Sequence, residues 1–415
     1  MRRPFAALIP ALSDAGWLDG PRLRRIALVF AMLGLAALGF DIWQHTRAGL
    51  TAPDGEQLGR DFVNYWAGAH LAAHGHAVQV YDLGRFAAWE RAHTAPNADF
   101  KWFSYPPVTL LVLLPLAGFG FAAGYAAWLG AGWLACAALL RRHLGPGAAL
   151  LAAAATPAAI INALSGQNGA FSACLMAGGL LSLKERPWLA GMLFGTLVFK
   201  PHLAILVPVA LVAGGQWRTL AAAALTAAAL CGASLWLFGA PVWAAFLHNA
   251  PINALLMEHD HDLWHRMPSA FAAARLAGAG IQVAAGVQLL SAAGAAILTA
   301  RVWRSGASSE LRGAVLIVAT FLATPYAWDY DLVSLTFAVV WLAAEAQRTG
   351  FRPWEKIALF ATLAMPLAIS PLAAASSIQV GPLMLWALLG LAARRVQSGE
   401  AAAVRAMTAV VKAAV

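Results

Sequence analysis

The chain has 415 residues, of which 61% are hydrophobic and 11% are charged, and its formal net charge is +9. An average soluble domain carries roughly 25% charged residues, so this composition excludes a water-soluble globular protein. The positive charges are spread among apolar blocks rather than gathered in one patch, which argues against a nucleic-acid-binding protein and against a disordered chain. The composition therefore predicts an integral membrane protein.

Long apolar blocks predict the membrane-spanning helices. A spanning helix needs about 20 apolar residues, and the first candidate runs over 26–43. No small-residue cleavage site closes that block, so we expect it to be retained as the first span. A polar stretch follows to Ser104, and from Pro106 the chain is almost continuously apolar. The later blocks are 106–119, 123–140, 148–164, 168–183, 188–214, 218–238, 280–300, 313–327, 332–347, 354–371 and 380–393. Together they predict an all-α protein with about twelve spans.

Lysines and arginines in short loops predict which loops face the cytoplasm. Five arginines precede the first span, and basic residues also lie in the turns near 301–312 and 348–356 and after the last block. We therefore expect a cytoplasmic N-terminal segment (1–25) and a cytoplasmic C-terminal tail (394–415).

Two long polar segments lack an excess of basic residues. Segment 44–104 holds five basic and six acidic residues, and segment 240–278 holds two basic and three acidic residues. Both are predicted to be outer loops of a single polytopic domain over 26–393.

The middle of the chain leaves two topologies open. Arg141-Arg142 and Lys184-Glu185-Arg186 favour the cytoplasm, whereas simple alternation of the blocks places them outside. Either 106–140 crosses the membrane only once, or 188–214 folds into a hairpin around Lys200-Pro201.

The segment 59–70, shortly after the first span, carries the most informative polar pattern. On a helix, Asp61, Asn64 and Tyr65 share one face and apolar side chains share another. This pattern predicts an amphipathic helix at the outer interface with one carboxylate aimed at a polar cleft. A carboxylate so placed can act as a general base, although a solvated acid or a charge set against the helix dipole would explain the same residue.

Two short segments near the predicted membrane surface carry side chains that bind by hydrogen bonding. Tyr105 precedes Pro106-Pro107 where the outer loop re-enters the membrane, as an interfacial anchor or a cavity wall. The turn at 165–169 contains Gln167 and Asn168, whose amides suit either a plain polar turn or the binding of sugar hydroxyls.

Cationic side chains occur in two places suited to an anion. Lys200 lies in the middle of an apolar block, close to His202, and a lysine there costs a few kcal/mol unless it reaches an anion or water. It is either a snorkelling lysine or a ligand for a lipid phosphate. His265 and Arg266 end the outer segment 258–266, which is a solvated loop, a phosphate or sugar contact, or a metal site; it lacks the usual zinc-ligand spacing, so we expect no metal.

A late segment, 324–331, combines two acids with three aromatic residues. Tyr326, Asp329 and Asp331 suit carbohydrate binding, because rings stack on sugar C–H faces while carboxylates accept hydroxyl hydrogens. An aromatic belt with helix-capping acids explains the same residues.

In their order and spacing these segments resemble glycosyltransferase family 87, the polyprenol-phosphate-mannose-dependent mannosyltransferases of the GT-C fold. The resemblance rests on Asp61-Phe62-x-x-Tyr65-x-x-Gly68, Tyr105-Pro106-Pro107, Gly166-Gln167-Asn168, Phe199-Lys200-Pro201-His202 and Thr324-Pro325-Tyr326 with its acidic followers. It implies a GT-C-type bundle with interfacial helices in the first outer loop. It also implies an active site on the outer face of the plasma (inner) membrane.

The resemblance further implies roles for individual residues. Asp61 takes the proton from an acceptor hydroxyl, which attacks the anomeric carbon of a sugar linked to a polyprenyl phosphate, with inversion. The sugar is mannose or another pentose or hexose, the acceptor is a lipid or a glycan, and no cofactor is needed. From the charge of their side chains rather than from the resemblance, we assign the donor phosphate to Lys200, His202, His265 and Arg266. The sugar and acceptor are assigned to Asn64, Tyr65, Tyr105, Gln167, Asn168, Tyr326, Asp329 and Asp331. The family often has a histidine after the aromatic of the late motif, where this chain has Asp329-Tyr330-Asp331.

Two other functions remain as alternatives. A lipid or glycan transporter or flippase ranks lower, because only Lys200 sits deep in an apolar block and no inverted repeat is visible. A polysaccharide polymerase or ligase would place its catalytic loop late in the chain, where 258–266 is the candidate.

Overall fold

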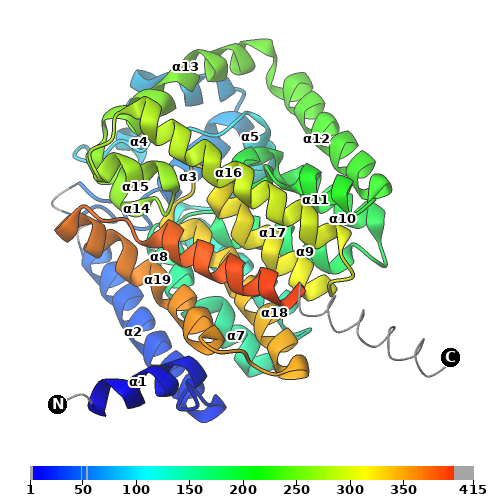
Figure 1. Cartoon of the computed structure of the whole chain (residues 1–415). Coiled ribbons are helices and arrows are strands. Elements are labelled where there is room, and N and C mark those ends of the chain that lie inside the picture. The colour runs from blue at the N-terminus through cyan, green and yellow to red at the C-terminus, as the bar shows by residue number, and fades with distance from the viewer. Residues whose placement is uncertain (1–2, 48, 53–54, 397–415) are drawn as a thin grey trace.

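The computed structural model describes residues 3–47, 49–52 and 55–396, and within these ranges all regular elements are helices (Figure 1). An isolated bridge between Thr51 and Gln57 is the extent of β-pairing there. The all-α prediction is therefore confirmed. Most of the predicted C-terminal tail, 397–415, lies outside the described residues.

The helices follow one another with short connections. In chain order they are α1 (Arg3–Asp14), α2 (Gly20–Arg47), α3 (Phe62–Ala73), η1 (Ala77–Tyr81), α4 (Leu83–His93), α5 (Val108–Leu113), η2 (Leu114–Gly118), α6 (Phe121–Leu140), α7 (Pro146–Ala155), α8 (Pro157–Leu164), α9 (Gly169–Ser182), α10 (Pro187–Thr196), η3 (Leu197–Phe199), η4 (Pro201–Ala204), α11 (Val207–Ala213), α12 (Trp217–Phe238), α13 (Ala240–His259), α14 (His261–Arg266), α15 (Ala270–Leu276), α16 (Ile281–Arg304), α17 (Ser309–Ala323), η5 (Asp329–Val333), α18 (Ser334–Thr349) and α19 (Glu355–Ser376). A further helix spans 381–396.

Five described helices are long and apolar enough to cross a bilayer, namely α2, α6, α12, α16 and α19. The bent pair α7 and α8, with 55° between them, would make a sixth. About twelve spans were expected, and the structure does not show that number. The reason is that several apolar blocks fold into short or broken helices: block 106–119, for example, becomes α5 and η2, so only α6 within 106–140 is long enough to cross.

The first span, α2, exposes its apolar side chains. Met32, Leu33 and Phe40 are each more than 60% exposed. Removing such surface from water is favourable by roughly 25 cal/mol per Å², so this helix is stable only where lipid covers it.

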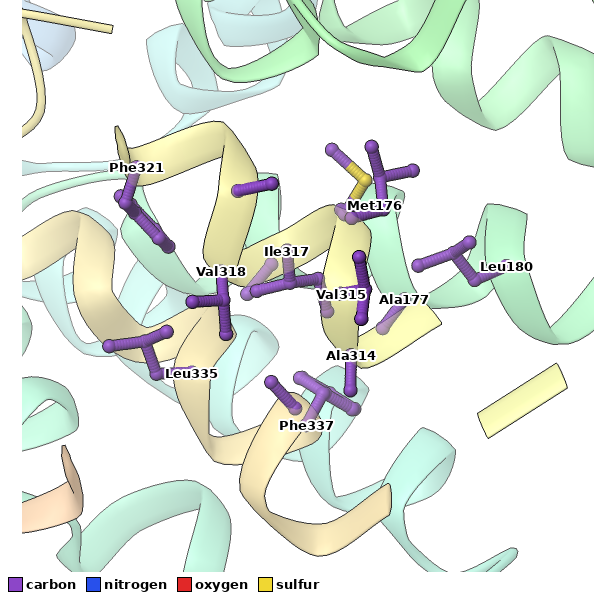
Figure 2. Close-up of a cluster of buried hydrophobic side chains, with 14 of the residues drawn as sticks. Met176, Ala177, Leu180, Ala314, Val315, Ile317, Val318, Phe321, Leu335 and Phe337 are labelled. Carbon is purple, nitrogen blue, oxygen red and sulfur yellow. The ribbon is translucent and has the colours of Figure 1, made fainter. Parts of the chain in front are cut away.

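The buried core is built around α17, whose residues Gly313–Ala323 are all buried. A helix that is apolar all round belongs inside a protein or a membrane. Met176 of α9, Val315 and Ile317 of α17 and Phe337 of α18 lie in one cluster (Figure 2). This core fixes the C-terminal end of α17, and with it the turn that leads to Asp329.

The helix α3 differs from the amphipathic interfacial helix expected for 59–70. Nearly all of it is buried, including Phe62 and Tyr65. Aromatic residues of α6 pack against Phe62 and η2 also contacts the helix, while Asp61 and Asn64 face a cavity inside the protein. The expected lipid-facing surroundings were wrong because helical periodicity alone does not reveal that other helices cover the apolar face.

The apolar block 188–214 breaks at Lys200–Pro201, between η3 and η4. Proline lacks a backbone N–H and excludes its predecessor from helical geometry, and Lys200 accordingly has φ −140° and ψ 65°. The break places one charged residue inside the protein.

The N-terminal helix α1 contacts the start of α19 at one end of the molecule. At one end, Trp354 N donates to Ser13 O at the close of α1, and Arg395 pairs with Glu355. Figure 1 places α1 at the bottom of the view and α13 at the top, with α4 near it. The outer loops predicted at 44–104 and 240–278 therefore lie toward the end opposite α1.

Candidate active site

A cavity of ≈ 690 Å³ is lined by segments far apart in the sequence. Of the residues predicted to form the site, those that line it are Asp61, Asn64, Tyr105, Gln167, Lys200, His202, Arg266 and Tyr326. The structure thus brings together side chains from both predicted outer loops, from the turn after α8 and from the break in block 188–214.

The other predicted site residues lie beside this cavity rather than on its wall. Tyr65 and Asn168 are buried behind Gln167, while Asp329 and Asp331 each hold a cation that lines the cavity. His265 faces Asp262, with 3.9 Å between Nδ1 and the carboxylate. Among the described residues, no group of three or more His, Cys, Asp and Glu side chains is placed to hold a metal ion.

Asp61 is held at the start of α3 by its backbone and its neighbour. The preceding Gly59 and Arg60 have positive φ angles of 68° and 41°, and the strain at Arg60 is offset by its guanidinium, which binds Glu56, Asp41 and the carbonyl of Leu164. The Asp61 amide donates to Ser165 O at 3.2 Å. These bonds tie the start of α3 to the turn after α8.

That turn requires a glycine. Gly166 has φ +60°, and a Cβ there would meet Gly59 O at 2.2 Å and Phe62 Cβ at 2.5 Å. The carbonyl oxygen of Gly59 belongs to the backbone, so it cannot move away from such a Cβ unless the loop that leads to Asp61 also moves.

Gly166→Ala is therefore expected to lower both stability and activity, because the new methyl group separates the turn from α3. Thermal unfolding and initial rates of the purified variant measure the two effects. Gly145→Ala is a suitable control, because its Cβ would meet open space. Unchanged stability and rate in Gly166→Ala would contradict the assigned packing.

A chain of hydrogen bonds leads from Asp61 into the protein. Gln167 Nε2 donates to Asp61 Oδ2 at 2.9 Å, and Gln167 Oε1 accepts from the hydroxyls of Tyr65 and Tyr105. Asn168 Nδ2 donates to the Tyr65 hydroxyl at 2.9 Å. Lys200 Nζ donates to Asn168 Oδ1 at 2.9 Å, so the chain ends on a cation.

Lys200 and Arg266 both line the cavity, and they differ in how much of the side chain is exposed to a ligand. Lys200 is 2% exposed and its ammonium lies 2.5 Å from Asp331. Arg266 forms a bidentate pair with Asp329 at 2.9 Å yet keeps 36% of its side chain exposed. Arg266 also lies 5.8 Å from the ring centres of Trp328 and Tyr330. Arg266 is the cation that an anion entering the cavity can reach more directly.

Several cavity residues were not predicted from the sequence. They are Phe100, Lys101, Trp102, Ser104, Trp243, Phe246, Leu256 and Leu263. Lys101 and Trp102 lie at the end of the predicted outer loop 44–104, shortly before Tyr105, so their position in the chain was the available signal. Trp243 and Phe246 of α13 carried no polar pattern that could have marked them.

Glu90 of α4 is a buried carboxyl group, and its burial raises its pKa. The side chain is 1% exposed, Oε2 accepts from the Lys101 amide at 3.3 Å, and Oε1 has no hydrogen-bond partner among the described residues. Burial raises the pKa of Glu90 to about 8, against the weaker lowering effect of Lys101.

The contribution of Glu90 to the stability of the fold should therefore fall as the pH rises from about 4.5 to about 8. Below about pH 4.5 Glu90 is protonated in the folded and unfolded states, so it adds no penalty. Between 4.5 and about 8 the unfolded chain loses this proton while the folded chain retains it, which favours unfolding. We expect Glu90→Gln to raise the Tm at pH 8 and not at pH 4.5. Glu185→Gln, at an exposed glutamate, is the control; equal Tm differences at both pH values would refute the assignment.

The fold and site together define a helical membrane protein with an acid and cations facing one cavity near the end opposite α1. The chain matches glycosyltransferase family 87 over residues 102–325, more than half of its length, and belongs to that family; it is a membrane glycosyltransferase. The matched range includes Gln167, Lys200 and Arg266, whereas Asp61 precedes it. No curated protein and no solved structure matches the chain.

Proposed function

We propose that this glycosyltransferase moves a sugar from a polyprenyl-phosphate donor to a lipid or glycan hydroxyl, with Asp61 as the general base. The acceptor hydroxyl gives its proton to Asp61 and its oxygen forms a bond to the anomeric carbon. The bond from that carbon to the phosphate oxygen breaks, and the polyprenyl phosphate leaves with the electron pair. A single displacement inverts the anomeric centre, and one base is sufficient because phosphate leaves without protonation.

The observation that carries this proposal is the shared cavity. Asp61 and Arg266 both line one space of ≈ 690 Å³, which gives a base for the acceptor and a cation for the departing phosphate within the same chamber. The cavity also has apolar lining from Trp243, Phe246 and Leu256, which suits the first isoprene units of the donor.

The aromatic residues of the late segment support a carbohydrate in the cavity. Tyr326, Trp328 and Tyr330 line it, and ring faces pack against the C–H faces of sugars. The proposed sugar is mannose or another hexose or pentose, handled at the outer face of the plasma membrane. Both termini would then be cytoplasmic, in keeping with the basic residues near each.

The proposal is tested by supplying the purified, detergent-solubilised chain with a radiolabelled polyprenyl-phosphate mannose and an extract of membrane lipids. We expect label to appear in a new glycolipid or glycan product. Movement of the labelled donor across a proteoliposome membrane without covalent transfer would instead favour a flippase.

Arg266 gives a separate prediction for donor binding. A lysine at this position keeps the charge and loses the planar fork that pairs with both Asp329 and a phosphate. Arg266→Lys should raise the KM for the donor by roughly tenfold and change kcat less. Arg275→Lys is the control, since that guanidinium binds the carbonyls of Ala279 and Glu258. An unaltered donor KM in Arg266→Lys would remove Arg266 from the phosphate site.

A further inference from the structure

We propose that Gln167 is a positioning residue that presents one oxygen of Asp61 to the acceptor, and that Lys200 sets the direction of the hydrogen bonds that hold it. This inference rests on the proposed function, because it concerns how the base is held. The sequence suggested instead that Gln167 contacts the sugar and that Lys200 contacts the donor phosphate.

The hydrogen-bond partners of the Gln167 amide fix its orientation. Its oxygen lies within hydrogen-bonding distance of the hydroxyls of Tyr65 and Tyr105, and its nitrogen lies 2.9 Å from Asp61 Oδ2. An ionised carboxylate only accepts hydrogen bonds, so the nitrogen must face Asp61. The reverse orientation would set the amide oxygen against the carboxylate.

Lys200 lies at the far end of this chain of hydrogen bonds. A lysine ammonium only donates hydrogen bonds, so Lys200 forces Asn168 to turn its oxygen toward Nζ, at 2.9 Å. The nitrogen of Asn168 then donates to the Tyr65 hydroxyl. That hydroxyl, having accepted this bond, has its own proton to give to Gln167. The hydroxyls of Tyr65 and Tyr105 also lie 2.7 Å apart, so the Tyr65 proton reaches Gln167 directly or through Tyr105. In both arrangements the Gln167 oxygen accepts and its nitrogen faces Asp61.

One carboxylate oxygen of Asp61 remains available to the acceptor substrate. Gln167 engages Oδ2 of Asp61, and the structure gives Oδ1 no hydrogen bond among the described residues. Asp61 lines the cavity. A base held by one oxygen offers the other in a defined direction, which is the condition for proton transfer in a near-attack geometry.

The contacts of Lys200 differ from those expected of a residue that binds phosphate. Its ammonium already contacts Asp331 and Asn168, and it lies 4.9 Å from the ring centre of Tyr330, at 2% exposure. A lysine that binds donor phosphate would change the donor KM when altered, whereas one that orients the base would change kcat.

The decisive experiment replaces Gln167 by glutamate. Gln167→Glu keeps the shape of the side chain and an oxygen for both tyrosines, and it replaces the amide donor by a second carboxyl group facing Asp61. Two adjacent carboxyl groups cannot both ionise readily. We expect kcat to fall by about 10²-fold, the acidic limb of the pH–rate profile to move by at least about one unit to higher pH, and the donor KM to stay within about twofold.

A matched control comes from another buried amide. Gln288 of α16 accepts from the Phe271 amide and donates to Leu322 O, and it does not line the cavity. Gln288→Glu should lower the Tm while leaving the pH–rate profile of the folded protein unchanged. A shift in both variants would show a general effect of buried charge and would overturn the inference.

Tyr65→Phe provides a second variant if Gln167→Glu does not fold. It keeps the ring and removes the hydroxyl that relays the direction from Asn168 to Gln167, and Tyr65 is not part of the cavity wall. We expect kcat to fall about tenfold with an unchanged donor KM.

The outcomes separate this inference from the function on which it rests. If Asp61→Asn is inactive but Gln167→Glu and Tyr65→Phe behave like the wild type, the positioning role is wrong and the proposed function stands. If the wild-type chain transfers no sugar from a polyprenyl-phosphate donor, both fail.

Discussion

Asp61→Asn is expected to lower the rate of sugar transfer by about 10²- to 10⁴-fold, the range that a positioned general base contributes. The amide has nearly the same shape as the carboxylate and can still meet Gln167, but it cannot take the proton of the acceptor hydroxyl. The loss should therefore appear in kcat, while the KM for the polyprenyl-phosphate donor stays close to the wild-type value. Initial rates with the labelled donor measure both.

Asp82→Asn is the matched control for this variant. Asp82 lies in the same outer segment and its carboxylate is half exposed, accepting from the Arg85 amide at the start of α4. Its replacement should cost some helix capping and leave the rate intact. A fully active Asp61→Asn protein would remove Asp61 from the chemistry and the proposed mechanism with it.

Lys200→Met is expected to cost the folded state about 3–5 kcal/mol, because it leaves Asp331 as an uncompensated buried charge. Lys200 and Asp331 are 2% and 0% exposed, and their side chains lie 2.5 Å apart. Replacing both partners by apolar residues, as in Lys200→Met with Asp331→Leu, should recover much of that loss. Urea or thermal unfolding of the two variants in detergent measures the difference.

The buried ion pair between Arg395 and Glu355 lies far from the cavity, so its disruption is the control for losing a buried ion pair elsewhere in the fold. Both side chains are 3% exposed, and the pair lies at the other end of the molecule, near the turn between α18 and α19. Arg395→Met should destabilise the fold to a comparable degree and leave the kcat of the folded protein unchanged. If Lys200→Met were as stable as the wild type, the ion pair would not be buried in the way the structure has it.

The class of protein and the candidate residues were accessible from the sequence because they depend on local composition. Apolar blocks predicted a helical membrane protein, and short polar motifs between them pointed to Asp61, Gln167, Lys200 and Arg266, which line one cavity. The family resemblance was confirmed over 102–325. These residues could be recognised in the sequence because a charged or amide side chain within an apolar segment is costly unless it has a partner or lines a cavity.

The expectations that differed depend on contacts between distant segments. About twelve spans were counted from block lengths, but Pro201 and Pro157 divide apolar blocks into shorter helices, and hydropathy does not register such breaks. The apolar face of α3 is covered by α6 and η2 rather than by lipid, so its periodicity gave the wrong surroundings for that face.

The sequence by itself determined that the chain is helical and lipid-embedded and which polar side chains are candidates, because hydropathy and residue chemistry act along the chain. Only the tertiary structure decided which of those side chains pair with one another: Asp331 pairs with Lys200, Asp329 pairs with Arg266, and Gln167 donates a hydrogen bond to Asp61. Each of these partners is more than 60 positions away in the chain, and hydrogen bonds and ion pairs form between whichever groups the packed helices bring within about 3 Å.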